Sequence, residues 1–470
     1  MKILLINPPI KNIIQAELPP ALSREVGVFP PLGLMYIASY LQKYSDQRVR
    51  ILDAVAEDLD QAALEEAIRK STPQVIGITA HTNNLLDVHL LIRLIKKIDS
   101  KTHVNIGGPH ARVFPQETLQ LSGVDSVIPG EGEIPFFQLV EALSQGKDLK
   151  KVPGLIFKEG EEVISGKGPV PPPDLDRLPF PARDLIKSPL YYYILGKKST
   201  FTTMVSSRGC PHHCIFCSTP KENYRRRSVR NVVQEMEECR HLGVKEIHFV
   251  DDTFNLSPEW VISFCQEIKK RDLQIPWSFR GRIDTLTREV LRQLKEANCI
   301  RMNLGVETST DEGLRRLRKG LTIHQIEEVF AWAKEIGIPT VAYFLIGCPQ
   351  EKSRKDILHT FRFAKRLNPD FALFNILTPY PDTELYREGL EKGLFGKDFW
   401  REFALHPTKD FEIRVWEEFF TKKELERILI SIYRRYYFRP SLIFKNLRFI
   451  LHPRVFFWKA KTALKILRSN

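Results

Sequence analysis

Three cysteines lie close together near the middle of the chain, at Cys210, Cys214 and Cys217. Their spacing places three thiolates on one short loop, where the sulfur atoms can face a common centre. Thiolates are soft ligands that suit iron–sulfur clusters, zinc or copper(I). Three protein ligands leave one metal position open, and an open position is typical of a catalytic site rather than a structural one.

Zinc in a structural loop is the alternative interpretation. It is disfavoured because no fourth cysteine or histidine with zinc-finger spacing follows, and His212 and His213 lie inside the loop itself. The chain has seven cysteines, and an odd number in a large chain argues against a disulfide framework. The other four, which we interpret as buried apolar residues or leave unassigned, are Cys239, Cys265, Cys299 and Cys348.

The cysteine loop directly follows the first of six expected strands. These strands are predicted from short apolar runs at residues 202–206, 246–250, 275–279, 302–306, 340–346 and 372–377. Helical patterns separate them at residues 229–242, 258–271, 288–298 and 323–336. Six strand–helix units predict an incomplete TIM-type (β/α) barrel, whose reactive end is the C-terminal edge of its strands.

A separate α/β domain is expected before the barrel. Its strands are predicted at residues 2–6, 48–52, 75–79, 103–106 and 126–128, with amphipathic helices such as 31–40 and 85–98 between them. Such alternation predicts a Rossmann-like, doubly wound parallel sheet with helices on both faces. Ligands of these sheets bind at the carboxyl ends of the strands.

A proline-rich stretch divides the two halves. Six prolines fall between Pro169 and Pro181, a density that neither a helix nor a central strand tolerates. We therefore predict a sheet domain at 1–150, a linker at 151–197, a barrel at 198–400 and a helical, basic C-terminal extension at 401–470.

The net charge of +13 is concentrated near the C-terminus, because residues 427–470 contain eleven basic residues and no acidic one. The remainder of the chain is nearly neutral, which disfavours a nucleic-acid substrate. Residues 454–468 follow an amphipathic helical pattern, and residues 433–439 mix aromatic and basic side chains. A helix on anionic lipid and a helix packed on the barrel both fit this pattern. With no apolar run long enough for a spanning helix or signal peptide, we expect a cytoplasmic protein, with peripheral contact to the inner membrane face left open.

The motif Cys-x3-Cys-x2-Cys, with an aromatic residue before the last cysteine and a barrel around it, resembles the radical S-adenosylmethionine (SAM) superfamily. The resemblance implies that the three cysteines hold a 4Fe–4S cluster and that SAM chelates its fourth iron. One electron then cleaves SAM to methionine and a 5′-deoxyadenosyl radical, which abstracts a hydrogen atom from substrate.

The same resemblance assigns SAM binding to residues at the ends of successive strands. These are Phe216, Asp251, Asp252, Arg282, Glu307 and Gly347. Phe216 would pack on the adenine, and the two aspartates end the second strand, where the family binds the SAM amino group. An arginine can pair with a carboxylate and a carboxylate with a ribose hydroxyl. After the sixth strand, Asp382 replaces the glycine of the family's Pro-Gly-Thr turn.

The first domain resembles the cobalamin-binding domain of cobalamin-dependent radical SAM enzymes. The matching positions, which we assign to the corrin, are Asn7, Pro8, Gly107, Gly108, Gly130 and Glu131. The Asp-x-His-x-x-Gly lower-ligand motif of classical cobalamin methyltransferases is absent, so a domain that has lost cobalamin remains an alternative. Methylthiotransferases of transfer RNA are disfavoured, since their first domain carries three cysteines and this one carries none.

These resemblances imply cobalamin-dependent methylation of an unactivated carbon, with no further catalytic residue assigned. An oxidative reaction, as in the anaerobic cyclase of chlorophyll synthesis, and a non-catalytic metal-stabilised binding protein are the alternatives. The expected partners are an external one-electron donor of flavodoxin or ferredoxin type and a small-molecule substrate. The 29 phenylalanines and the C-terminal stretch favour a hydrophobic substrate.

Overall fold

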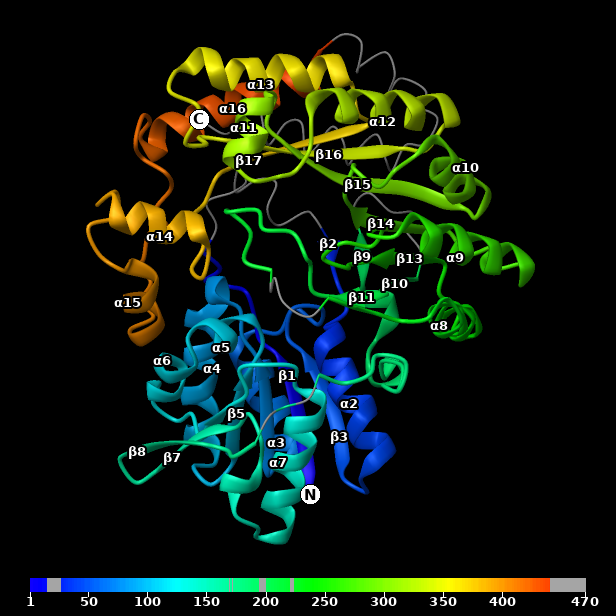
Figure 1. Ribbon diagram of the computed structural model, residues 1–470. Helices are drawn as coiled ribbons and strands as arrows, with labels where there is room; N and C mark the ends of the chain where they lie inside the picture. Colours follow the sequence, from blue (N-terminus) through cyan, green and yellow to red (C-terminus); the bar gives the residue numbers. More distant parts are fainter. Residues whose placement is uncertain (15–26, 169, 171, 194–199, 220–223, 440–470) are drawn as a thin grey trace. The chain divides into compact units, whose positions relative to one another are not determined.

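The computed structural model describes residues 1–14, 27–168, 170, 172–193, 200–219 and 224–439 (Figure 1). The chain divides into two compact units. The first contains Met1–Ile14, Val28–Tyr192 and Lys397–Glu412, and the second contains Tyr193–Gly396 and the described residues from Ile413 on. The first unit therefore includes most of the segment predicted as a linker, together with a short stretch from beyond the barrel.

A seven-stranded sheet forms the centre of the first unit, in the order β3-β1-β4-β5-β6-β7-β8. The strands are β1 (Lys2–Asn7), β3 (Arg48–Asp53), β4 (Val75–Thr79), β5 (His103–Gly107), β6 (Ser126–Val127), β7 (Ile156–Glu159) and β8 (Glu162–Ser165). The first five are parallel, as predicted, and β7 and β8 add an antiparallel hairpin at one edge. The prediction of an unbroken linker over 151–197 was wrong here, because Gly160 at φ +63° lets the chain turn back between two short strands.

Helices cover both faces of this sheet. They are α2 (Leu32–Tyr44), α3 (Gln61–Ser71), α4 (Leu85–Ile98), α5 (Pro109–Val113), α6 (Pro115–Gln120), α7 (Glu133–Gln145) and α15 (Phe399–Leu405), with short 3₁₀ turns at Thr82–Asn84, Leu149–Lys151, Arg183–Leu185 and Ser188–Leu190. Ile3 and Leu5 of β1 pack in one apolar core with residues of α2 and α7. Helix α15 reaches this unit from the C-terminal part of the chain, and Arg401 pairs with Glu117 of α6 at 3.0 Å.

The second unit is built on a six-stranded parallel sheet in sequential order. The strands are β10 (Phe201–Met204), β13 (Glu246–Phe249), β14 (Trp277–Gly281), β15 (Cys299–Glu307), β16 (Thr340–Ile346) and β17 (Phe371–Ile376). A sequential parallel order with helical crossovers is the arrangement of a partial (β/α) barrel. The predicted barrel is thus confirmed. Short strands β11 (Ser207–Arg208) and β12 (Arg225–Arg226) pair antiparallel, and two-residue strands occur at β2 (Gly27–Val28) and β9 (Tyr192–Tyr193).

Helices follow the barrel strands and pack on one face of the sheet (Figure 1). They are α8 (Val229–His241), α9 (Pro258–Lys270), α10 (Arg288–Glu296), α11 (Asp311–Arg316), α12 (Ile323–Ile336), α13 (Arg354–Leu367), α14 (Glu384–Glu391) and α16 (Lys422–Tyr437). Aromatic side chains fill the layer between β13, β14 and α9, where Phe249 meets Phe264 and Trp277 edge to face. This apolar layer fixes the positions of β13 and β14, and residues of the candidate site follow the C-terminal ends of these two strands.

Helix α16 covers the edge strand β17. Tyr433 Oη donates to the carbonyl of Phe374 and accepts from its N–H, both at 3.0 Å. Tyr437 Oη makes the same pair of bonds with Ala372. The aromatic residues of 433–437, which suggested lipid contact from sequence, are therefore used inside the fold.

The amphipathic helix expected at 454–468 lies outside the described residues. Among the helices that the structure describes, none has the length and apolar character needed to cross a membrane.

Candidate active site

The cysteine loop begins where the first barrel strand ends, and a buried aspartate holds that junction. Asp251, at the end of β13, accepts hydrogen bonds from the Ser206 amide, the Ser206 hydroxyl at 2.6 Å and the Ser207 hydroxyl at 2.7 Å. These donors offset the burial that raises the pKa of Asp251. Asp251 thus ties the second strand end to the residues that lead into Cys210.

The loop is also held at its middle and at its end. Ile215 donates its N–H to Leu317 O at 3.2 Å and accepts from Leu385 N at 2.9 Å. Asp252 accepts from the Gly209 N–H and from the Thr219 hydroxyl, each at 3.2 Å. Of the two aspartates predicted to bind SAM, the exposed Asp252 contacts both ends of the cysteine loop, whereas Asp251 is bonded to Ser206 and Ser207.

Two cations act on the thiols. Burial raises the pKa of Cys214, and the nearby charges of Lys319 and Arg282 oppose that rise. Thiolates, not thiols, are metal ligands, so cations beside a buried cysteine favour the form that binds metal. Cys210 Sγ lies 3.2 Å from Thr253 Oγ1.

The chemistry of the donors fits an iron–sulfur cluster. Three soft sulfur atoms lie on a loop without helix or strand, beside cations that offset the negative charge of a thiolate-bound cluster. In the part of the chain that is described, no three His, Cys, Asp or Glu side chains are already arranged to hold a single metal ion.

Arg282 and Glu307 each have an internal partner. Arg282 forms an ion pair with Asp284 at 2.9 Å and donates to Lys319 O at 2.6 Å. Glu307 accepts from Lys319 Nζ at 2.6 Å, and both side chains are buried. Glu307 holds φ +69°, an uncommon conformation that turns the chain sharply where β15 ends. Phe216 is half-buried within the cysteine loop.

Gly347 follows β16 at φ +73°, and a buried glutamate supports the turn it begins. Glu351 accepts from the Cys348 N–H at 3.0 Å and from the Thr360 hydroxyl at 3.2 Å. Burial raises the pKa of Glu351 to about 7. Asp382, in place of the expected glycine, holds φ +63°, a conformation that glycine adopts without strain.

In the first unit, the predicted corrin residues lie along the carboxyl edge of the sheet. Asn7 ends β1 and donates to Asp53 Oδ1 at 2.8 Å. Pro8 is buried beside it, and Gly130 and Glu131 follow β6. Gly107 ends β5, and Gly108 holds φ +92°, where a Cβ would lie 2.8 Å from Thr79 Oγ1. Strands β1 and β4 are neighbours whose connections leave in opposite directions, which makes this edge a topological switch point.

Two histidines at the same edge follow predicted strand ends but were not among the residues assigned to the corrin. His81 follows β4 and is exposed, whereas His110 is completely buried near it. His110 Nδ1 lies 3.0 Å from Thr82 Oγ1, and its Nε2 has no hydrogen-bond partner in the structure. Burial lowers the pKa of His110 to about 3, so the ring is neutral. The ring nitrogen of His110 lacks a partner among the described residues, and Gly108 brings the backbone closer than any residue with a Cβ could. Both features fit a bulky ligand at this edge. A search for the Asp-x-His-x-x-Gly motif does not find these histidines, because they follow β4 and β5 rather than β1.

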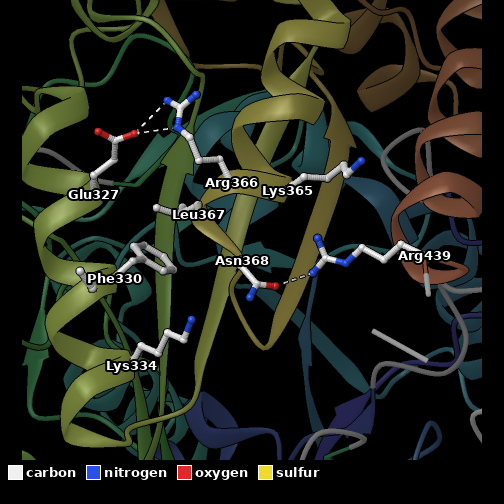
Figure 2. Close-up of a pocket in the computed structure, with 9 residues that line it drawn as sticks. Glu327, Phe330, Lys334, Lys365, Arg366, Leu367, Asn368 and Arg439 are labelled. Carbon is white, nitrogen blue, oxygen red and sulfur yellow. Dashed lines mark hydrogen bonds and ion pairs between the residues drawn. The ribbon is translucent and has the colours of Figure 1, made fainter. Parts of the chain in front are cut away.

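A separate cavity of 710 Å³ opens at the far end of the barrel strands (Figure 2). Its lining includes Glu327, Lys334, Arg366, Asn368 and Arg439. Arg366 pairs with Glu327 at 2.8 Å, and Arg439 donates to Asn368 Oδ1 at 2.7 Å. The cations from the last turns of α12 and α13 complement the negative ends of those helices. The cavity lies at the N-terminal edge of β16 and β17, opposite the cysteine loop, and we assign it no part in the reaction.

Comparison with protein-family models identifies both halves. The model of the radical SAM superfamily matches residues 204–364, and that of the B12 binding domain matches residues 22–140. The first match contains the cysteine loop and five of the six barrel strand ends. The second contains Gly107, Gly108, Gly130 and Glu131.

Curated relatives align over most of the chain. An uncharacterized methyltransferase of Pyrococcus horikoshii is 34% identical over 456 residues, which is 95% of each chain. An anaerobic magnesium-protoporphyrin IX monomethyl ester cyclase of Rubrivivax gelatinosus is 29% identical over 77% of this chain and 66% of its own length.

One solved structure with a similar fold is the radical SAM methyltransferase TsrM from Kitasatospora setae, with cobalamin and a 4Fe–4S cluster bound. It superposes with a TM-score of 0.67 at 20% identity and covers 83% of this chain and 74% of its own. At that identity the likeness establishes the fold.

Proposed function

Because this chain belongs to the radical SAM superfamily and carries a B12 binding domain, we propose that it is a cobalamin-dependent enzyme that methylates an unactivated carbon of a small molecule. The observation that carries the proposal is the loop of three cysteines at the C-terminal edge of the first barrel strand, beside Lys319 and Arg282. The relative from P. horikoshii, named a methyltransferase, supports the reaction class.

Each residue of the candidate site has a separate proposed role. Cys210, Cys214 and Cys217 would hold the cluster, and the charges of Lys319 and Arg282 would favour the thiolate form of Cys214. Asp252, exposed beside the loop, would accept hydrogen bonds from the SAM amino group. Gly347 and the turn supported by Glu351 would approach the adenine. When bound, the cluster would supply the electron that cleaves SAM, and cobalamin would carry the methyl group.

In the first unit, the carboxyl edge of the sheet would hold the corrin. Gly108 lets the backbone approach the end of β4 closely, and His81 follows β4 at the topological switch point. Asn7, Pro8, Gly107, Gly130 and Glu131 complete the edge that we assign to cobalamin.

Radical SAM enzymes require an external electron and a substrate. For this chain we propose a donor of flavodoxin or ferredoxin type, which delivers single electrons at low potential. Peripheral contact with an anionic membrane through the basic residues beyond Arg439 is a second, separate part of the proposal, supported by the charge pattern of the sequence.

Oxidative cyclisation is the second candidate reaction. The similarity to the cyclase of R. gelatinosus over 77% of this chain supports it. Both reactions would use the same cysteines and the same corrin, so product analysis is what separates them.

The test is anaerobic reconstitution with iron, sulfide, hydroxocobalamin, SAM and a reductant, for the wild-type protein and for Cys214→Ala. We expect the wild type to bind iron and corrin and to form 5′-deoxyadenosine, and the variant to lose iron and nucleoside formation. Cys265→Ala is the matched control, because Cys265 is buried in α9 away from the loop. Nucleoside formation without bound corrin would exclude the methylcobalamin reaction. Absence of both would leave a non-catalytic metal-binding protein.

A further inference from the structure

The face of the barrel sheet that points away from the helices carries a group of polar residues. Strand register places eight of them together with Glu246 and with apolar residues such as Val341 and Leu373, since paired neighbours of parallel strands share a face. The eight polar residues are Thr203, His248, Ser278, Arg280, Arg301, Asn303, Tyr343 and Asn375. An apolar substrate would leave such a face without polar partners, and burying unpaired polar groups is costly.

Part of this face is internally satisfied. Arg301 donates to Ser278 Oγ at 3.0 Å and pairs with Glu246 at 3.3 Å. His248 Nδ1 lies 2.9 Å from Ser278 Oγ. The only carboxylate in this network is thus already neutralised by Arg301.

The next positions toward the strand ends are not satisfied. Asn303 donates from Nδ2 to the hydroxyls of Tyr193 and Tyr343, each at 3.2 Å, while its Oδ1 is buried without a partner among the described residues. Buried His248 Nε2 and Asn375 Oδ1 also have no hydrogen-bond partner in the structure. Accepting from Asn303 leaves the Tyr343 O–H free to donate to a ligand.

Arg280 lies beside these groups, and its positive charge is available to a ligand. It is exposed, and its guanidinium forms no ion pair or hydrogen bond with the described residues. Burial holds the pKa of the His248 ring well below its usual range, and the charges of Arg280 and Arg301 lower it further. The ring is neutral, so the positive charge here comes from the arginines alone.

We propose that this face binds an anionic group of the substrate, a carboxylate or a phosphate-type group, through Arg280 and the Tyr343 hydroxyl. The inference rests on the proposed function and adds the chemical class of its substrate. It replaces the hydrophobic substrate favoured from composition with one that carries at least one anionic group. A planar guanidinium binds such oxygens in a bidentate manner, and a neighbouring O–H fixes their orientation.

The carboxylate of SAM has the same chemistry, and two observations favour the substrate instead. Arg282 and Lys319 are the cations whose charges act on Cys214, whereas Arg280 acts on His248 and Tyr343. Arg280 also lies within β14, whereas Arg282 follows the C-terminal end of that strand, the edge at which the cysteine loop lies.

The test is calorimetric titration of the SAM-bound holoenzyme with inorganic phosphate and, separately, with acetate. We expect saturable binding of one of the two, weakened about tenfold or more in Arg280→Gln and a few-fold in Tyr343→Phe. Arg288→Gln, which removes an exposed arginine of α10 paired with Glu335, is the matched control and should bind as the wild type does. Failure of both anions to bind the wild type, or equal binding by Arg280→Gln, would overturn the proposal.

Equilibrium dialysis with SAM in the absence of substrate separates the two sources of the anion. Arg280→Gln should bind SAM as tightly as the wild type, and a loss of SAM binding would assign Arg280 to SAM and overturn the substrate assignment. Neither measurement needs turnover. An enzyme that forms no 5′-deoxyadenosine would therefore contradict the proposed function and leave this inference to be decided by binding. Circular dichroism and bound iron confirm that each variant is folded and loaded.

Discussion

Glu351 is a carboxylic acid in a site where its charged form is disfavoured. The side chain is buried, and its hydrogen bonds to Cys348 N and Thr360 Oγ1 only partly offset that burial. Its pKa of about 7 in the folded protein lies above the value of 4.5 expected for an exposed glutamate. The folded state therefore retains this proton at pH values where the unfolded chain has released it.

This shift makes stability fall as pH rises from about 5 to about 7, at a total cost of about 3 kcal/mol. Below that window both states are protonated, and above it the folded state must bury a charge. Thermal unfolding of the wild type should show a falling midpoint across this window, and Glu351→Gln should flatten the slope. Glu312→Gln, at an exposed position of α11, should leave the slope unchanged. An identical slope in the wild type and Glu351→Gln would show that Glu351 does not titrate there.

At the scale of elements, the open edge of the barrel depends on α16. A parallel sheet that does not close leaves unpaired backbone groups on its last strand. Tyr433 and Tyr437, one turn apart on α16, satisfy the N–H and C=O of Phe374 and Ala372 on β17. Both hydroxyls are buried, which raises their pKa values and keeps them protonated as donors.

Replacing either tyrosine by phenylalanine keeps the ring and removes both bonds. We expect each variant to lose about 1–3 kcal/mol of unfolding free energy, because two buried backbone groups lose their partner. Denaturant unfolding measures this loss, and Tyr44→Phe, on an exposed side chain of α2, is the control. Variants as stable as the control would mean that water replaces the tyrosines at the edge.

Local signals predicted the elements well where they were strong. Helix Ile323–Ile336 has the predicted bounds, since Thr322 and Gln325 form a capping box and Gly337 ends it in the left-handed conformation. Strand Val75–Thr79 is equally clear as an isolated apolar run. The hairpin β7–β8 was missed because its strands are short and rich in charged residues. The packing of α16 on β17 was one of two interpretations that the sequence left open, because a tyrosine that bonds a distant backbone group looks the same in sequence as one that faces lipid.

The site was predictable to a similar degree. A motif places Cys210, Cys214 and Cys217 on one loop without knowledge of the fold. The polar face around Arg280 depends on strand register across six strands, which no local pattern reveals. Likewise, Asp251 matched a family position, yet only its contacts with Ser206 and Ser207 show that it holds the loop.

At the scale of the whole molecule, each of the two compact units has its own sheet and its own set of strand ends. Cobalamin and the cluster are assigned to different units, so loading of one cofactor should be separable from loading of the other. Loss of iron in Cys214→Ala with corrin retained is one half of that expectation. The other half requires a substitution that disturbs only the first unit.

Gly108→Ala is that substitution. At φ +92° a Cβ would lie 2.8 Å from Thr79 Oγ1 and 2.9 Å from Ala80 O, so the ends of β4 and β5 must move apart where we place the corrin. We expect the variant to retain iron and lose most corrin absorbance at 1:1 hydroxocobalamin. Gly146→Ala is the matched control, since Gly146 also has a positive φ, of +63°, but nothing within 4 Å of the added Cβ, and it ends α7 away from that edge. Gly146 is in the left-handed conformation (φ +63°, ψ +29°), where an alanine costs about 1 kcal/mol, whereas Gly108 at φ +92° and ψ −177° lies in a region essentially confined to glycine, so strain adds to the displacement of the strand ends. Retained iron in Gly108→Ala would then show that the loss of corrin arises in the first unit. Loss of iron in Gly108→Ala would show that the two units load their cofactors together.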